Sequence, residues 1–475
     1  MNILFATSEA TPFAISGGLG EVAGALPKAL CAKGEDVRII IPLYECVTAE
    51  QRKNFKFLCH FDVPVAWRQQ YCGLFETTFD GVTYYLLDNE YYFKRSYLYG
   101  HYDDAERFAF FSKAVLEVIQ RIPDWKPDII HCNDWQSALI PVYYNCLYAN
   151  RKAYKDIRTV YTIHNIQYQG IYGKNILGDI IDISPSDYPL LDYNGAVNFS
   201  KGAIECTNKV TTVSPSYAKE ILDPWYSHGL DSILHKASWK LTGILNGIDT
   251  ESYNPQTDKT LRYHYSAKSM VGKAKCKTEL ETYFGFTHKP EVPIISLISR
   301  LVSHKGLDLI MNMIDELLIT TEVRFIVLGT GDTKYEDFFR ELAARHPDKF
   351  RLELAFNQIL SRQTYAGSDM FLMPSKSEPC GLAQMIALRY GTIPIVRETG
   401  GLRDTITDSG DGIGNGFTFK TYNAGDLHWA INRAIDLFYN DKITWKKLVK
   451  RALLCDNSWE KSADLYLEMY KEALS

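Results

Sequence analysis

The stretch "ILFATSEATPFAISGGLGEVAGALPKAL" (residues 3–30) shows the pattern that decides the fold. An apolar run typical of a strand leads into a loop with four glycines, and a helix-like run follows. A glycine loop of this kind lets backbone N–H groups approach an anion at a helix N-terminus. Gly18, Gly20 and Ala23 also match the G-x-G-x-x-A dinucleotide fingerprint, but no acidic residue follows the next strand to bind a ribose. The loop alone is equally typical of a tight turn that packs a helix on a strand.

The same alternation of strand and helix continues along the 475 residues. Unbroken apolar runs are typical of parallel strands that are covered on both faces. The runs of the first half are ILFAT, DVRIIIP, TYYLLD, DIIHCND, RTVYTIHN and KVTTVSP, and those of the second half are PIISLISR, VRFIVLGT, FRLELAF, DMFLMPS and TIPIVRE. Two such series predict an α/β protein with two Rossmann-like, doubly wound domains.

The boundary between the domains is expected in the turn-rich segment KLTGILNGIDTESYNP (240–255). We expect a first domain over residues 1–241, a second over 242–455, and a tail helix over 456–475 that packs back on the first domain. Ligands of doubly wound folds bind at the carboxyl ends of the strands. A deep cleft between the two domains is therefore the expected site.

Composition excludes several classes of partner. The net charge is −5 and no basic block occurs, so nucleic acid and anionic membranes are not expected partners. The ten cysteines show no zinc spacing and are expected to be reduced thiols in a cytoplasmic protein. No signal peptide, membrane span or metal site is expected.

Two cations follow a strand of the second half. Arg300 ends the run PIISLISR, and Lys305 lies five residues further on, where a helix is expected to begin. Two cations at a helix N-terminus are unfavourable unless an anion lies between them. A diphosphate would satisfy both, with arginine as a planar fork and lysine as a point charge. A solvated basic loop is the alternative.

A carboxylate follows the next strand of the same half. Glu378 comes after DMFLMPS and before a helix-like run, where it can cap the helix or stabilise positive charge on a reacting sugar. Cys380 is expected to be a small buried residue rather than a nucleophile.

Polar residues also follow two strands of the first half. His164 lies just past RTVYTIHN's apolar run and Asp134 ends DIIHCND. Either side chain could be structural, but their shared position after strands favours a substrate site. A second glycine turn, ETGGLRDT (398–405), repeats the small-Gly-Gly-Leu pattern of SGGL (16–19) and suggests a second loop on the same ligand.

Taken together, the motifs resemble the bacterial glycogen synthases and plant starch synthases, ADP-glucose-dependent enzymes of the GT-B glycosyltransferase fold (family 5). The resemblance covers nearly the whole chain. It rests on SEATPFAISGGLGEVAGALPKAL, AERFAFFSKAVLE, HCNDWQSALIP, TIHNIQYQG, TTVSPSYAKEI, LNGIDTESYNP, ISRLVSHKGLDL, MPSKSEPCGLAQMIALRYGTIPIVRETGGLRDT and WEKSADLYLEMY, in that order.

The resemblance implies a retaining transfer of glucose from ADP-glucose to the non-reducing end of an α-1,4-glucan, without metal or other cofactor. It implies that Arg300 and Lys305 neutralise the departing ADP, that Glu378 steadies the oxocarbenium character of the glucose, and that His164 binds that glucose. Asp134 would line the same site. The remaining residues expected to contact donor or acceptor are Ser16, Gly17, Gly18, Glu21, Tyr99, Asn246, Cys380, Gly381, Thr399, Gly400 and Gly401.

Three positions depart from the family pattern. Ile15 stands where the first loop commonly has lysine, Ile386 stands where related glycosyltransferases have a second glutamate, and Phe356 lies near a position that commonly has a tyrosine for adenine. Ile15 suggests an alternative, namely a weakened paralogue that binds glucan or nucleotide without turnover. A nicotinamide dehydrogenase is a third reading, which rests only on the glycine fingerprint.

Overall fold

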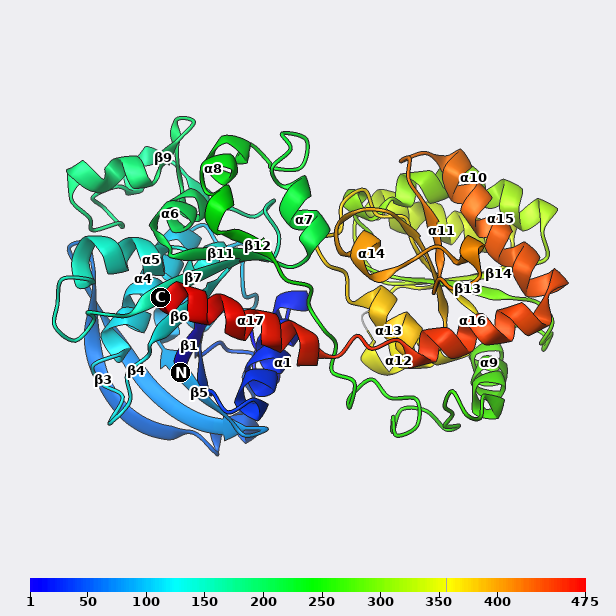
Figure 1. The fold of residues 1–475 in the computed structure, drawn as a ribbon, viewed down its shortest axis with the longest axis horizontal. Coiled ribbons are helices and arrows are strands. Elements are labelled where there is room, and N and C mark those ends of the chain that lie inside the picture. Colours follow the sequence, from blue (N-terminus) through cyan, green and yellow to red (C-terminus); the bar gives the residue numbers. More distant parts are fainter. Residues whose placement is uncertain (356) are drawn as a thin grey trace. The chain divides into compact units, whose positions relative to one another are not determined.

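The computed structural model describes residues 1–355 and 357–475, which form two compact units (Figure 1). The first unit comprises Met1–Gly247 together with Trp459–Ser475, and the second comprises Ile248–Ser458.

The first unit is built on a nine-stranded sheet of order β12-β11-β7-β6-β1-β2-β5-β4-β3. Its strands are β1 (Asn2–Ala6), β2 (Asp36–Pro42), β3 (Lys56–Val65), β4 (Arg68–Phe79), β5 (Val82–Asp88), β6 (Ile129–Asn133), β7 (Arg158–Ile163), β11 (Lys209–Thr212) and β12 (Leu241–Gly243). The strands from β12 to β5 are parallel, and β4 and β3 extend the sheet as an antiparallel edge. A small second sheet has the order β8-β10-β9 and comprises β8 (Ile171–Tyr172), β9 (Asp192–Tyr193) and β10 (Ala196–Asn198).

The strand order creates a switch point beside β1. The chain passes from β1 to β2 on one side of the sheet, and later returns to β6 on the other side of β1. In an open parallel sheet, ligands bind where the order reverses, beyond the carboxyl ends of the strands. The ends of β1 and β6 are therefore the expected binding edge of this unit.

Helices of the first unit include the last helix of the chain. They are α1 (Gly18–Ala32), α2 (Ala49–Arg52), α3 (Glu90–Phe93), α4 (Asp104–Val118), α5 (Leu139–Tyr143), α6 (Phe199–Cys206), α7 (Pro215–Glu220), α8 (Asp231–Lys236) and α17 (Trp459–Leu474). The side chains of Trp459, Tyr466 and Tyr470 on α17 enter one core with α1, β1 and β2. Their spacing places them on one face of the helix, so α17 is an integral layer of this unit (Figure 1).

The second unit has a wholly parallel six-stranded sheet of order β15-β14-β13-β16-β17-β18. Its strands are β13 (Ile294–Ile298), β14 (Arg324–Leu328), β15 (Phe350–Glu353), β16 (Met370–Met373), β17 (Ile393–Arg397) and β18 (Phe417–Phe419). This is the order of a Rossmann domain, and its switch point lies between β13 and β16.

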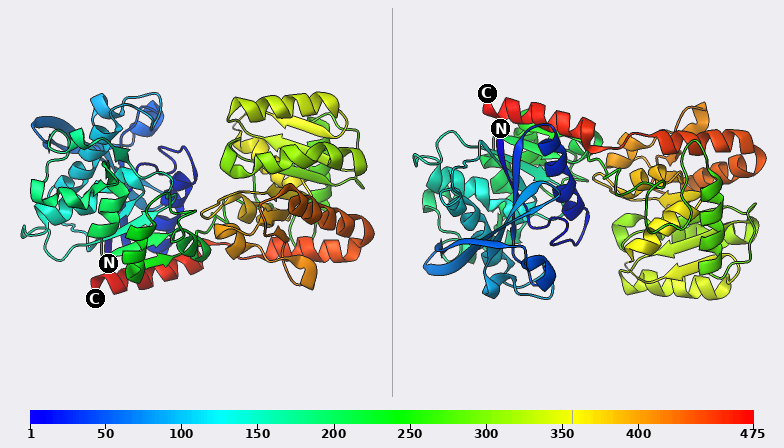
Figure 2. Two further views of the ribbon diagram at one scale, coloured as in Figure 1. Left: turned by 90° about the horizontal axis from the view of Figure 1, so that it is seen from above. Right: turned by 90° about the horizontal axis from the view of Figure 1, so that it is seen from below.

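Helices lie on both sides of this sheet (Figure 2). They are α9 (Val271–Tyr283), α10 (Leu307–Thr320), α11 (Thr333–Arg345), α12 (Gln358–Gly367), α13 (Ala383–Arg389), α14 (Gly400–Thr405), α15 (Ala424–Asn440) and α16 (Lys442–Leu454). No helix of the described residues in either unit combines the length and the hydropathy that a bilayer span requires.

The predicted fold class is confirmed, since all eleven predicted apolar runs contain a strand and both sheets have a parallel core. The long strands β3 and β4 were not predicted. Both strands lie toward one end of the sheet and leave many side chains exposed, so neither has the unbroken apolar run of a central strand. A local signal was present, because Asp80 and Gly81 both have positive φ and join β4 to β5 as a two-residue hairpin turn.

Candidate active site

The predicted residues of the first unit gather at its switch point. Asp134 directly follows β6, His164 directly follows β7, and the glycine loop lies between β1 and α1. These strands are parallel neighbours in the order β7-β6-β1, so their carboxyl ends meet at one edge. Residues that are far apart in sequence are thereby brought to one place.

Asp134 is held in a strained backbone conformation. Its φ of 55° and ψ of 179° lie in a region that residues other than glycine rarely adopt, at a cost of about 1–3 kcal/mol. Its Oδ1 accepts a hydrogen bond of 2.7 Å from the backbone N–H of His164. Burial raises the pKa of Asp134 to about 7, although backbone N–H groups of His164 and Asn165 oppose the rise. This conformation places the carboxyl group at the edge of the sheet. Its hydrogen bond to His164 joins the end of β6 to the end of β7.

His164 has its ring against a second residue of β6. Its Nε2 lies 2.9 Å from Oδ1 of Asn133. Burial lowers the pKa of His164 to about 3, so the ring is uncharged at neutral pH. An uncharged imidazole has one N–H donor and one acceptor, and it can bind a hydroxyl group but cannot neutralise a phosphate.

The glycine loop already binds an anion, and that anion is the carboxylate of Glu9. Its oxygens accept hydrogen bonds from the N–H of Ser16 at 2.5 Å, the hydroxyl of Ser16 at 2.7 Å and the N–H of Gly17 at 3.1 Å. The hydroxyl of Tyr99 donates to the same carboxylate at 2.7 Å. Glu9 is only 4% exposed, so a buried side chain holds the loop in place. A phosphate that used these two N–H groups would have to replace Glu9.

The other predicted residues of the first unit lie at the start of α1 or near the end of the unit. Gly18 is the first residue of α1, and Glu21 lies in the first turn of that helix. Asn246 is buried near the end of the unit, and its Oδ1 has no hydrogen-bond partner among the described residues. A buried acceptor without a partner is rare in a folded protein and is consistent with a ligand contact.

In the second unit, Lys305 and Glu378 form a partly buried ion pair. Arg300 is exposed and lies two residues beyond β13, whereas Lys305 ends a short 3₁₀ helix before α10. Lys305 Nζ donates to Glu378 Oε2 at 2.7 Å, and Ser375 Oγ donates to the same oxygen at 3.0 Å. Glu378 is 7% exposed. The cation after β13 and the carboxylate after β16 thus meet at the switch point of this unit.

The second glycine turn packs directly against the loop that carries Glu378. The N–H of Gly401 donates to the carbonyl oxygens of Glu378 and Pro379, at 3.1 and 3.2 Å. A Cβ atom on Gly400, whose φ is 45°, would overlap the carbonyl oxygen of Glu378, and one on Gly401 would overlap that of Cys380. These two glycines therefore allow the two loops to touch. The predicted residues that complete this region are Cys380, Gly381 and Thr399, of which Cys380 and Thr399 are buried.

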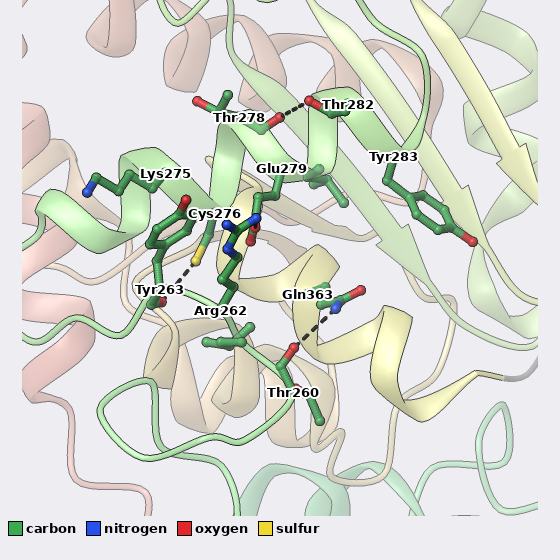
Figure 3. A pocket seen from close by; sticks show the side chains of 12 residues that line it. Thr260, Arg262, Tyr263, Lys275, Cys276, Thr278, Glu279, Thr282, Tyr283 and Gln363 are labelled. Carbon is green, nitrogen blue, oxygen red and sulfur yellow. Dashed lines mark hydrogen bonds and ion pairs between the residues drawn. The ribbon is translucent and has the colours of Figure 1, made fainter.

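A pocket elsewhere in the second unit contains none of the predicted site residues. It has a volume of about 610 Å³ and lies between α9 and the segment at residues 260–263 (Figure 3). Tyr263 and Tyr283 line it at separate places, with Arg262 and Glu279 between them (Figure 3). The pocket does not reach the ends of β13 and β16, where Lys305 and Glu378 meet.

Comparison with known proteins decides the family. The family described as starch synthase catalytic domain matches residues 2–236, and the family described as glycosyl transferases group 1 matches residues 281–451. Glycogen synthase of Bacillus cereus (strain B4264) is 48% identical over 478 residues, which cover all of both chains. The chain belongs to the glycogen and starch synthase family.

Further relatives agree with membership of the glycogen and starch synthase family. Glycogen synthase of Clostridium acetobutylicum is also 48% identical over the full length of both chains. The catalytic domain of starch synthase IV from Arabidopsis thaliana, solved with ADP and acarbose, has a TM-score of 0.93 and 36% identity, and covers 100% of this chain and 99% of its own. Sucrose-phosphate synthase from Thermosynechococcus elongatus, with a TM-score of 0.62 and 15% identity, shares the fold. The chain is therefore a glycosyltransferase with the predicted GT-B fold.

Two departures from the family pattern lie in described residues, and one does not. Ile15 is 42% exposed on the glycine loop, and Ile386 is buried in α13. Phe356, which was expected near adenine, lies outside the described residues.

Sequence reasoning missed three residues that hold the site. Glu9 binds the glycine loop, Asn133 binds His164, and Ser375 binds Glu378. Each lies at or just beyond the end of a strand, as the predicted residues do. Their positions after predicted strands could have nominated them as candidates. The residues that they bind become clear only when the strands are assembled into the sheet.

A buried histidine of the first unit predicts acid sensitivity. His131 on β6 has no exposed surface, and its ring contacts Tyr470 Oη at 2.7 Å and Thr162 Oγ1 at 2.6 Å. Burial lowers the pKa of His131 from 6.5 to about 3. Between these values the unfolded chain binds a proton that the folded chain does not, so stability is complete above about pH 6.5 and falls on acidification, by about 1.4 kcal/mol per pH unit.

The measurement is urea denaturation of the wild type and His131→Gln between about pH 5 and pH 6.5. The free energy of unfolding of the variant is expected to fall less on acidification than that of the wild type, by about 1.4 kcal/mol per pH unit. His60→Gln, at an exposed position on β3, is the control and should follow the wild type. Parallel curves for wild type and His131→Gln would contradict the prediction.

Proposed function

We propose that this glycosyltransferase moves glucose from ADP-glucose to the non-reducing end of an α-1,4-glucan, with retention at the anomeric carbon and release of ADP. The chemistry of the reaction supports this proposal. Breaking the bond between sugar and nucleotide places negative charge on the leaving phosphate and positive charge on the sugar ring. Preorganised groups of opposite charge stabilise such a transition state more than water does.

The ion pair between Lys305 and Glu378 is the observation that carries the proposal. An ammonium and a carboxylate 2.7 Å apart at one switch point can serve the two developing charges of a single breaking bond. Lys305 and the exposed Arg300 would bind the diphosphate of the donor and of the departing ADP. Glu378 would steady the hexose. No metal or other cofactor is part of the proposal, because side-chain cations fill that role.

The first unit would supply the uncharged contacts of the hexose and the acceptor. His164 is neutral and Asp134 lies beside it, so both can bind hydroxyl groups. Exclusion of water from the site would protect the activated sugar from hydrolysis, which competes with transfer to a glucan.

The ligands of the starch synthase IV structure support the donor and acceptor classes. That protein is bound to ADP and to acarbose. We extend the nucleotide and the oligosaccharide to this chain as part of the proposal, with adenine rather than uracil as the preferred base. A cytoplasmic location is included, since all ten cysteines are free thiols.

The test is release of ADP from ADP-glucose in the presence of glycogen. Radiolabelled glucose should enter the polymer and be released from it as maltose by β-amylase, which requires a new α-1,4 bond. UDP-glucose in a parallel reaction tests the base. No ADP release at high donor concentration would contradict the enzyme assignment and favour the alternative, a weakened paralogue that binds nucleotide or glucan, for which Ile15 is the supporting observation.

A further inference from the structure

Asn133 is the last residue of β6 and is 1% exposed. Its amide nitrogen, Nδ2, donates to the carbonyl oxygen of Ala6 at 3.1 Å and to that of His131 at 3.3 Å. Carbonyl oxygens can only accept hydrogen bonds, so the atom that faces them must be the amide nitrogen, and the side-chain amide cannot be flipped. The amide oxygen must therefore be the atom that faces His164.

This orientation decides which ring nitrogen of His164 carries the proton. Oδ1 of Asn133 can only accept, and it lies 2.9 Å from Nε2. A hydrogen bond at this distance requires the proton on Nε2. Because the ring is uncharged, Nδ1 then has no proton and can only accept a hydrogen bond.

We propose that Asn133 is a positioning residue that fixes His164 as its Nε2–H tautomer, so that Nδ1 accepts a hydrogen bond from a hydroxyl group of the transferred hexose. The role of the hexose rests on the proposed function, whereas the tautomer does not. Asn133 contributes no charge and need not touch the substrate. It acts through the imidazole ring of His164. In other active sites, a neighbouring residue orients a catalytic histidine in the same way, by a hydrogen bond to one ring nitrogen.

The backbone around the pair is built to keep this geometry. Asp134, the next residue, holds the N–H of His164 at 2.7 Å, so the backbone and the ring of His164 are each bound by a residue of the segment 133–134. A histidine held at its backbone N–H and at one ring nitrogen loses little freedom when the substrate binds, which favours the transition state over a loosely held alternative.

The direct test is the ¹⁵N spectrum of the histidine rings in the wild-type protein without substrate. The His164 signals are assigned by their loss in His164→Gln. They are expected to show a protonated Nε2 and an unprotonated Nδ1. A predominant Nδ1–H form would overturn the proposal, and this outcome needs no variant of Asn133 and no catalytic activity.

The kinetic test uses Asn133→Leu, which removes the acceptor while keeping a side chain of similar size. We expect the Nε2–H signal to lose its dominance and kcat to fall by about ten- to a hundredfold, with KM for the donor within about twofold of wild type. Asn89→Leu is the matched control, because Asn89 is also buried in the first unit and also uses both amide atoms in hydrogen bonds, to Tyr92 N and Tyr71 O.

The control should keep the His164 spectrum and kcat even if it loses stability. An Asn133→Leu protein that folds, with an unchanged tautomer and an unchanged kcat, would overturn the proposal. Asn133→Asp restores an acceptor at the same place, and recovery of the Nε2–H signal there supports it. A wild-type protein that shows the expected tautomer but releases no ADP would contradict the proposed function and leave the structural role of Asn133 established.

Discussion

Glu378→Gln is expected to lower kcat by about 10²- to 10³-fold while the protein stays folded. Glutamine keeps the size of the side chain and an oxygen for the hydrogen bond from Ser375, which is 3.0 Å in the wild type. It removes the negative charge that the proposed function assigns to the sugar. The fall should appear in kcat more than in KM, because the charge on the sugar develops in the transition state.

The partner of Glu378 provides a second comparison. Lys305→Ala leaves a carboxylate that is 7% exposed without its ammonium, and because the pair is only partly buried the cost should lie below the about 3–5 kcal/mol of a fully buried pair. Lys305→Ala should therefore lose both stability and activity, whereas Glu378→Gln should lose mainly activity, because the ammonium that it leaves lies on the more exposed side chain of the pair and can be hydrated. The double variant should be more stable than Lys305→Ala alone, since it contains no unpaired carboxylate.

Glu398→Gln is the control for Glu378→Gln. Glu398 directly follows β17 and accepts a hydrogen bond of 2.8 Å from Thr418, but it is not among the proposed site residues. Steady-state kinetics should find it close to wild type. A Glu378→Gln enzyme that keeps more than about a tenth of the wild-type kcat would contradict the electrostatic role of Glu378.

Ile15→Lys is expected to tighten donor binding by about tenfold or more, which corresponds to the 1.5–3 kcal/mol of a charge-assisted hydrogen bond. Ile15 is exposed beside Ser16 and Gly17, whose N–H groups are already bound to Glu9. An ammonium at position 15 would add to this loop the cation that it lacks. The gain should shrink as salt is added, because the new contact is exposed.

Isothermal titration with ADP and the KM for ADP-glucose measure this effect. Ile443→Lys is the matched control, since Ile443 is also exposed, lies on α16 and gives the same change in net charge. It should leave donor binding unchanged. An Ile15→Lys protein with wild-type affinity for ADP would show that the ammonium does not reach the phosphate, as would happen if it paired with Glu9 instead.

The strands of the parallel cores could be predicted because their burial leaves a local record. A strand such as β1 or β13, covered on both faces, must be apolar at almost every position. The antiparallel strands β3 and β4, which leave many side chains exposed, have no such constraint and were missed. The same logic nominated Asp134 and His164, because the residue that follows a buried strand in a doubly wound sheet lies at the edge where ligands bind in such folds.

The two α/β units with parallel cores, the family and the segments expected to form the site could be predicted from the amino-acid sequence, because each is recorded in short runs of neighbouring residues. The partners were decided only by the tertiary structure. Glu9 takes the N–H groups of the glycine loop, Lys305 meets Glu378 across 73 positions, and Asn133 meets His164 across 31. A hydrogen bond depends on atomic positions to within a few tenths of an ångström, and those positions exist only after crossover connections have placed distant strands side by side.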